Sequence, residues 1–122
     1  GNIDLTVRLG DAGGIEATGY TATSWITNGT LEPVTTSTTG FILSSAGEFA
    51  STETGHGQII LVLQDSSDNT WTATGSLITT PTAEFGAISG SKALSAELTQ
   101  VQLVLLAGAF DALAAKCADP AR

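Results

Sequence analysis

The chain has 122 residues, 42% of them hydrophobic, and a formal net charge of −8 from 12 acidic and 4 basic side chains. That length fits one domain with a core large enough to need no disulfide or metal. Four scattered cations cannot form the basic surface that nucleic acid or an anionic membrane requires, so the charge argues against both partners. The single cysteine, Cys117, cannot form an intramolecular disulfide, and no apolar run reaches the roughly 18 residues of a membrane-spanning helix.

Apolar and polar residues alternate with period 2 in several segments that turn residues separate, and this pattern predicts β-strands. The expected strands, in chain order, are residues 3–9, 20–26, 40–44, 58–63, 70–77, 83–88 and 99–105. Glycine-rich residues 10–14 and the Asn28-Gly29 dipeptide are expected to form turns. Residues 32–39, which contain a proline, are expected to form an edge strand or a loop, and residues 47–57 a polar loop.

The segment 58–63 is almost continuously apolar, which is typical of a strand that is buried on both faces or lies at the centre of a sheet. It is expected to form a hairpin with residues 70–77 across a turn at residues 65–69. The strand at 83–88 is expected to end at Ser89-Gly90-Ser91.

Residues 99–105 fit two patterns. Val101, Leu103 and Leu105 alternate with glutamines, which favours a strand, although Leu94, Leu98, Val101 and Leu105 also have helical spacing. We favour the strand. The alanine-rich residues 110–116 are expected to form one or two helical turns before Pro120.

Composition supports the same fold class, because the chain contains 19 threonines and 11 serines. Threonine is β-branched and suits a pleated, half-exposed surface, whereas helical proteins usually rely on glutamate and lysine for their polar faces. The sequence therefore predicts an all-β fold, an antiparallel β-sandwich or jelly roll. We expect one domain over residues 1–109 and a short irregular or helical tail over residues 110–122. Because the chain begins at Gly1 and not at methionine, we also expect either processing or removal of a tag, with sequence missing upstream.

No pattern of residues predicts catalysis, and we expect neither an enzyme nor a cofactor. His56 is the only histidine, and its flanking glycines favour a turn over a catalytic role or a zinc site. The acidic residues Glu48, Glu53 and Glu84 fall in or near expected loops, where carboxylates are usually solvated and where nothing fixes the separation that a glycosidase needs.

The segment Asp65, Asp68 and Asn69 offers three oxygen ligands of the kind that calcium prefers. It lacks the order of an EF-hand loop, and Asx side chains that cap a hairpin turn explain the same residues. We favour the turn and keep calcium as the lesser alternative.

Three aromatic residues are large enough to stack on a sugar ring or to fill a core: Tyr20, Trp25 and Trp71. Trp71 lies between Thr70 and Thr72 on the expected hairpin, and we favour the core for it. For Trp25 the two interpretations are equally weighted.

The second half of the chain has a recognisable order of motifs: Gly57 to Leu63, Asn69 to Gly75, Gly90 to Val101 and Phe110-Asp111-Ala112. This order of a strand, an Asn-Thr-Trp hairpin, a Gly-Ser-Lys turn, an alternating strand and a final Phe-Asp-Ala turn resembles a β-sandwich module found in phage tail-fibre and other virion proteins. The resemblance covers about residues 57–112. After Ala112 the family continues with a glycine and a last strand, whereas residues 113–117 here are typical of helical or irregular structure.

The resemblance implies a non-enzymatic bacteriophage virion structural protein on the particle surface, either a tail-fibre or spike module or a capsid decoration protein. It implies a homo-oligomer, with a trimer as the favoured state, in contact with other virion proteins. The alternative function is a carbohydrate-binding module that recognises cell-surface glycans. The candidate residues for contact with a glycan or a partner are Tyr20, Trp25 and His56.

Overall fold

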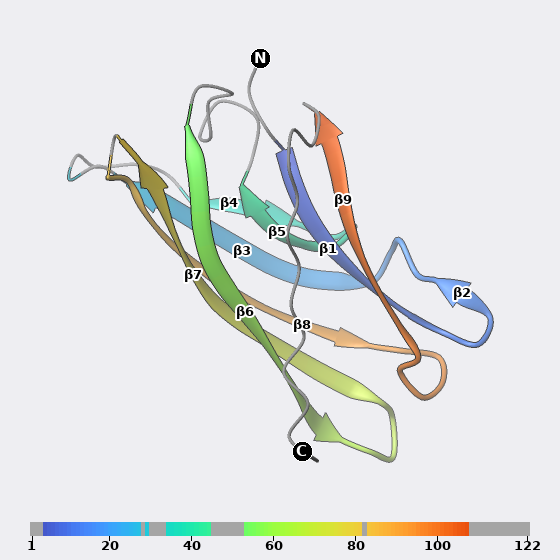
Figure 1. Cartoon of the computed structure of the whole chain (residues 1–122). Helices are drawn as coiled ribbons and strands as arrows, with labels where there is room; N and C mark the ends of the chain where they lie inside the picture. The colour runs from blue at the N-terminus through green and yellow to red at the C-terminus, as the bar shows by residue number, and fades with distance from the viewer. Residues whose placement is uncertain (1–3, 28, 30–33, 45–52, 82, 108–122) are drawn as a thin grey trace, which may run out of the picture.

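The computed structural model describes residues 4–27, 29, 34–44, 53–81 and 83–107, and all regular structure within them is β (Figure 1). The strands are β1 Asp4–Asp11, β2 Gly14–Ile15, β3 Tyr20–Thr27, β4 Thr35–Ser37, β5 Phe41–Ser44, β6 Thr54–Asp65, β7 Thr70–Thr80, β8 Phe85–Ala93 and β9 Gln100–Ala107. The predicted all-β class is confirmed. The choice of a strand over a helix at residues 99–105 is also confirmed, because β9 covers them.

The strands form two antiparallel sheets that lie against each other, as Figure 1 shows. In the smaller sheet β1 is central: it pairs with β9 along one edge and with β5 and β2 along the other. The larger sheet has the strand order β4-β3-β8-β7-β6. This arrangement confirms the predicted β-sandwich, and β4 is the edge strand expected within residues 32–39.

The core lies between the sheets and follows the period-2 patterns. Its buried side chains are Val7, Leu9, Tyr20, Ala22, Phe41, Ile42, Ala73 and Leu94. At its centre the rings of Tyr20 and Phe41 meet edge to face, with centroids 5.2 Å apart. Trp71 packs against this cluster, as the core interpretation of that residue requires.

An ion pair links two segments that are far apart in the sequence. Lys92 of β8 is buried, and its Nζ lies 2.7 Å from Glu16 Oε1. The Ser95 backbone N–H donates to Glu16 Oε2 at 3.0 Å, and the Ser95 hydroxyl lies 2.6 Å from the same oxygen. The Lys92 ammonium and the Ser95 hydrogen bonds lower the pKa of Glu16 from 4.5 to about 2. Residues far apart in the sequence thus hold the β1–β3 connection against the β8–β9 connection.

Two predicted boundaries are wrong, and glycine explains both. β8 continues through Ser89-Gly90-Ser91, because Gly90 leaves room for a core ring: a Cβ there would lie 2.6 Å from Cδ1 of Phe41. β6 begins at Thr54, inside the predicted loop 47–57. Strands β6 and β7 approach closely at Gly57, where a Cβ would lie 2.1 Å from the Ser76 carbonyl oxygen.

Some predictions fall outside the described residues. These are the turn at Asn28, the first part of segment 32–39, and the helical or irregular tail over residues 110–122. The described residues contain no helix that could cross a membrane.

Candidate functional site

The outer face of the larger sheet, turned away from the core, is lined by hydroxyl groups. Residues paired across antiparallel strands point to the same face, so the β-ladders define its rows. One row runs Thr21, Ser91, Thr72 and Val62 from β3 to β6, and the next runs Thr23, Ser89, Thr74 and Ile60. A shallow, open hollow of about 540 Å³ lies over β3, β4, β7 and β8 in this region. Its lining is uncharged and consists mainly of threonine and serine residues.

An apolar cluster occupies the other end of this face. Trp25 of β3 and Phe85 of β8 meet edge to face with ring centroids 6.5 Å apart. Phe85 is 47% exposed and is paired with Ile78 of the neighbouring strand β7, which is 41% exposed. The same row ends at His56, which pairs with Ile78. A smaller hollow of about 380 Å³ is lined by His56, Ile78 and Phe85 among others.

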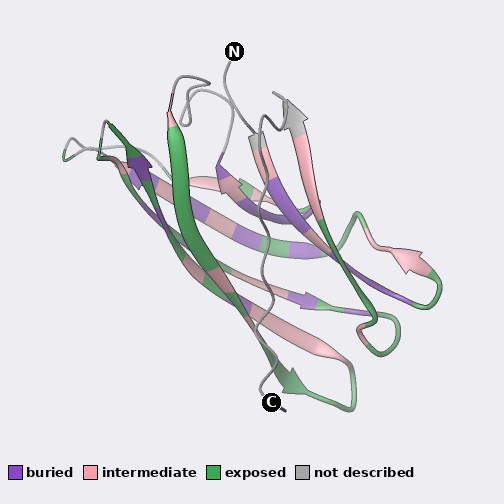
Figure 2. Ribbon diagram, in the orientation of Figure 1, coloured by how far each residue is buried: buried purple, intermediate pink, exposed green. Residues whose placement is uncertain are grey.

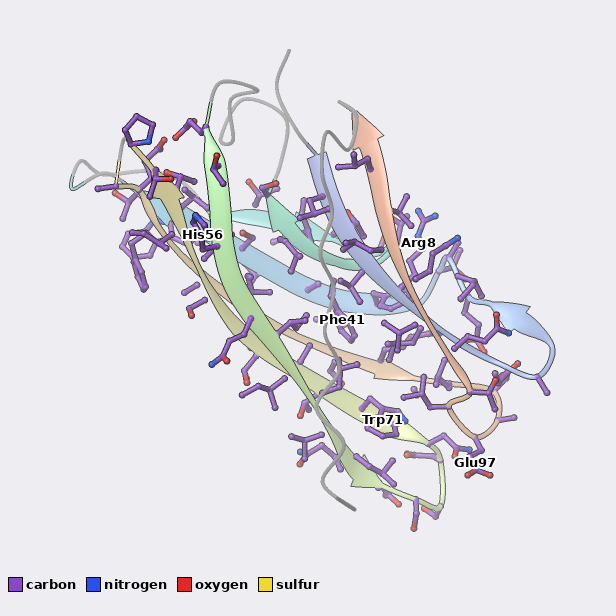
Figure 3. All side chains as sticks on the ribbon, in the orientation of Figure 1. Arg8, Phe41, His56, Trp71 and Glu97 are labelled. Atoms are coloured by element: carbon purple, nitrogen blue, oxygen red, sulfur yellow. The ribbon has the colours of Figure 1, made fainter. Side chains whose placement is uncertain are left out.

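Trp25 and His56 therefore lie on one face, but at opposite sides of it. They belong to β3 and β6, which β8 and β7 separate. Three inter-strand spacings of about 4.8 Å give a separation of about 14 Å between those strands. His56 belongs to strand β6, beside which Figure 3 labels it, and it is exposed, so the predicted turn around it is wrong. Both residues stay candidates for a contact surface.

Tyr20 does not belong to that surface, and its candidacy is corrected. Its side chain is 2% exposed and points into the core. Its hydroxyl accepts a hydrogen bond from the Leu9 backbone N–H at 2.8 Å and donates to the Glu16 carbonyl at 2.6 Å. Burial raises the pKa of this phenol. Tyr20 is a core residue whose hydroxyl satisfies the backbone of the β1–β3 connection.

Strand β6 is the most unusual part of the surface. It was predicted to be buried or central, and this is wrong: β6 is the outermost strand of the larger sheet and pairs only with β7 in the described part of the chain. Figure 2 shows it exposed along most of its length. Ile60, Val62 and Leu63 are 50%, 46% and 43% exposed. Their apolar character marks a surface that another chain can cover.

The turn after β6 uses its carboxylates locally. Asp65 Oδ1 accepts hydrogen bonds from the Ser67 hydroxyl at 2.6 Å and the Ser67 backbone N–H at 2.9 Å, which lower the pKa of Asp65. Asp68 Oδ1 accepts from the Thr70 hydroxyl at 2.5 Å and from its N–H at 3.1 Å. These bonds are those of Asx turns, as the turn interpretation requires. Among the residues the structure describes, no cluster of three His, Cys, Asp or Glu side chains is placed to hold a metal ion.

The structure describes two of the three carboxylates considered for glycoside hydrolysis. Glu48 lies outside the described residues, whereas Glu53 is next to the start of β6 and Glu84 precedes β8. Both Glu53 and Glu84 already have an interaction partner within the chain.

Comparison of the chain with protein-family models, with curated proteins and with solved structures gave no match. The surface described above is therefore interpreted from its own geometry.

The sequence patterns missed the residues that dominate this surface, namely Ile60, Val62, Ile78 and Phe85. One signal was available for the aromatic residues. Tyr20 and Trp25 are five positions apart in one strand, and an odd separation places two side chains on opposite faces. Only one of the two could therefore join an exposed face. For β6 the apolar run of residues 58–63 indicated that the strand needs to be covered. It does not indicate whether the same chain or another chain covers it.

Proposed function

We propose that the protein is a non-enzymatic structural module that assembles with further copies of itself. The observation that carries this proposal is the long, apolar and exposed edge strand β6. Monomeric proteins usually protect such edges with charge, proline or a covering element, because an open edge invites another strand. β6 contains no lysine, arginine or proline, and its one carboxylate, Asp65, lies at its very end.

The positions of the carboxylates also support a structural role. Asp65 and Asp68 are engaged in turn hydrogen bonds, and Glu16 is engaged with buried Lys92. The net charge of −8 keeps assembled copies soluble and limits non-specific association, so contact is directed to the uncharged parts of the surface. From the motif resemblance we further propose that the assembly belongs to the surface of a bacteriophage particle.

Sedimentation of the purified full chain over a wide concentration range tests the proposal. We expect the mass to rise from the 12.3 kDa of one chain to a defined multiple as concentration increases. A mass of one chain at every concentration up to the millimolar range would overturn self-assembly.

A second candidate function, glycan binding, is favoured by one specific observation. The Trp25–Phe85 pair lies on the same sheet face as the hydroxyl-lined hollow, and an aromatic ring beside hydroxyl groups suits a sugar's apolar and polar sides. We expect any glycan bound by the chain to be lost in Trp25→Ala. The control is Val101→Ala, an exposed apolar side chain on β9 of the other sheet. A glycan array without signal, or equal binding by both variants, counts against this site.

A further inference from the structure

The free edge of β6 has the features of a strand that pairs with another strand. It is 12 residues long, and among the residues that the structure describes only β7 pairs with it, along one of its two edges. Its pairing with β7 is regular from Thr54 to Leu63, and the first irregularity falls between Leu63 and Asp65. An edge strand of this length and regularity presents a row of backbone N–H and C=O groups directed away from its own sheet. The chemistry that satisfies such a row is an extended peptide strand.

We propose that β6 pairs antiparallel with β6 of a second copy, about a two-fold axis at Leu61, so that the two larger sheets become one continuous sheet. This inference rests on the proposed function of self-assembly and specifies its surface. The outer faces of the two copies, with their rows of hydroxyl groups, then form one uninterrupted surface.

Strand geometry restricts where such an axis can lie. A two-fold axis perpendicular to the sheet keeps the outer face of both copies on the same side. Residues directly opposite each other in antiparallel strands point to the same face, and neighbours along a strand point to opposite faces. The axis must therefore lie at one residue, so that this residue is directly opposite the same residue of the second copy. An axis midway between two residues would place an inward-pointing side chain opposite an outward-pointing one, which antiparallel pairing does not allow.

The sequence of β6 selects Leu61 for that position. The segment Gln58-Ile59-Ile60-Leu61-Val62-Leu63-Gln64 is symmetric in its chemistry about its central leucine. Pairing about Leu61 places Gln58 opposite Gln64, Ile59 opposite Leu63 and Ile60 opposite Val62, so like chemistry meets like along the whole segment. Cross-strand apolar pairs of this kind are what stabilise a β-ladder.

Neighbouring positions of the axis are poorer. An axis at Ile60 sets Gly57 against Leu63 and Gln58 against Val62, so apolar side chains lose their partners. An axis at Leu63 sets Asp65 opposite Leu61 and Gln64 opposite Val62, so polar side chains oppose apolar ones. With the axis at Leu61 the two Asp65 residues are eight positions apart along the ladder, or about 27 Å, which is beyond the range of unscreened repulsion.

The side chains near the axis already have the exposure that a partner strand needs. On the outer face, Ile60 and Val62 are about half exposed. On the inner face, Ile59 and Leu61 are only partly buried although they pack against the core cluster. A second strand beside β6 covers both sets. Because a two-fold contact closes on itself, it predicts a dimer in place of the trimer expected from the sequence.

A charge introduced at the edge tests this inference. Ile60→Lys removes both apolar Ile60–Val62 pairs of the proposed ladder and places two ammonium groups diagonally across it on the same face, where they repel each other. We expect the dimer dissociation constant to rise by about 10-fold or more. The matched control is Ile78→Lys, which makes the same change at a similarly exposed position of the same face, but on β7, whose two edges are both paired. Ile78→Lys should keep the wild-type dissociation constant.

Disulfide formation tests the register. In a Cys117→Ser background, the double variant Ile60→Cys/Val62→Cys places each cysteine directly opposite one from the other copy. We expect oxidation to link it into a covalent dimer. The control is His56→Cys, for which the proposed register separates the two cysteines by ten positions, about 34 Å, so it should stay unlinked.

The outcomes separate the inference from the proposed function. A wild-type oligomer that survives Ile60→Lys, or that links His56→Cys as readily as the double variant, overturns the Leu61 axis and leaves self-assembly intact. A wild-type chain that is monomeric at every concentration overturns both.

Discussion

Replacing Phe41 by alanine is expected to lower the free energy of unfolding by about 4 kcal/mol. The ring is fully buried between the sheets, packs edge to face on Tyr20 and fills the space that Gly90 leaves on β8. Its removal leaves a cavity that the β5 and β8 backbones cannot fill, because both are held in their sheets by ladder hydrogen bonds. Chemical denaturation at a fixed protein concentration measures the loss.

The control is the same substitution at Phe85, whose ring is 47% exposed on the outer face. Phe85→Ala is expected to cost less than about 1 kcal/mol. Equal losses at the two positions would contradict the assignment of Phe41 to the core.

The second large effect is expected at the ion pair. Glu16→Gln removes the charge that neutralises Lys92, whose side chain is only 6% exposed, and should cost about 3 kcal/mol. Lys92→Met should cost less, because it leaves Glu16, which is 23% exposed and keeps its hydrogen bonds from Ser95. Glu97→Gln is the control, because it makes the same chemical change as Glu16→Gln at an exposed position of the nearby β8–β9 connection. It should leave the free energy of unfolding almost unchanged.

The pH dependence follows from the direction of the Glu16 shift. Its pKa in the folded chain, about 2, lies below the ordinary value of 4.5. The unfolded chain therefore binds the proton first, and the stability that Glu16 supplies is complete above about pH 4.5 and lost as the pH falls toward 2. Between pH 4.5 and 2 the free energy of unfolding, measured by chemical denaturation, should decrease more steeply with falling pH for the wild type than for Glu16→Gln. Parallel curves would show that the carboxylate has no such role.

Strand identity was predictable where alternation was clear. The patterns at residues 3–9 and 20–26 correspond to β1 and β3, and residues 58–77 form the β6–β7 hairpin. These segments have a side-chain period that only an extended strand can place on one face. Where glycine interrupted the pattern, prediction was wrong, because Gly57 and Gly90 lie inside strands and allow close approach of a neighbouring strand or ring.

The position of β6 could not be predicted for a different reason. A continuous apolar run shows that a strand is to be covered, but a central strand and an edge strand that pairs with another chain have the same composition. The Lys92–Glu16 pair was also beyond prediction, since 76 positions separate its members and only the folded topology brings them together.

The candidate surface was predicted only in part. Trp25 and His56 lie on the face that the structure leaves open, whereas Tyr20 lies in the core. The hydroxyl-rich composition indicated a β-surface, but the rows of threonine and serine over β3, β7 and β8 depend on register, which sequence periodicity does not give.

Hydrogen–deuterium exchange of residues 58–64 at low and high protein concentration tests most directly whether the free edge of β6 is the assembly surface. We expect exchange in this segment to slow as concentration rises, because the β6 amides directed away from β7 gain hydrogen-bond partners in the dimer. Residues 72–76 of β7 should exchange equally at both concentrations, since β7 is already paired on both sides. Exchange in residues 58–64 that is the same at both concentrations, fast or slow, would contradict the account.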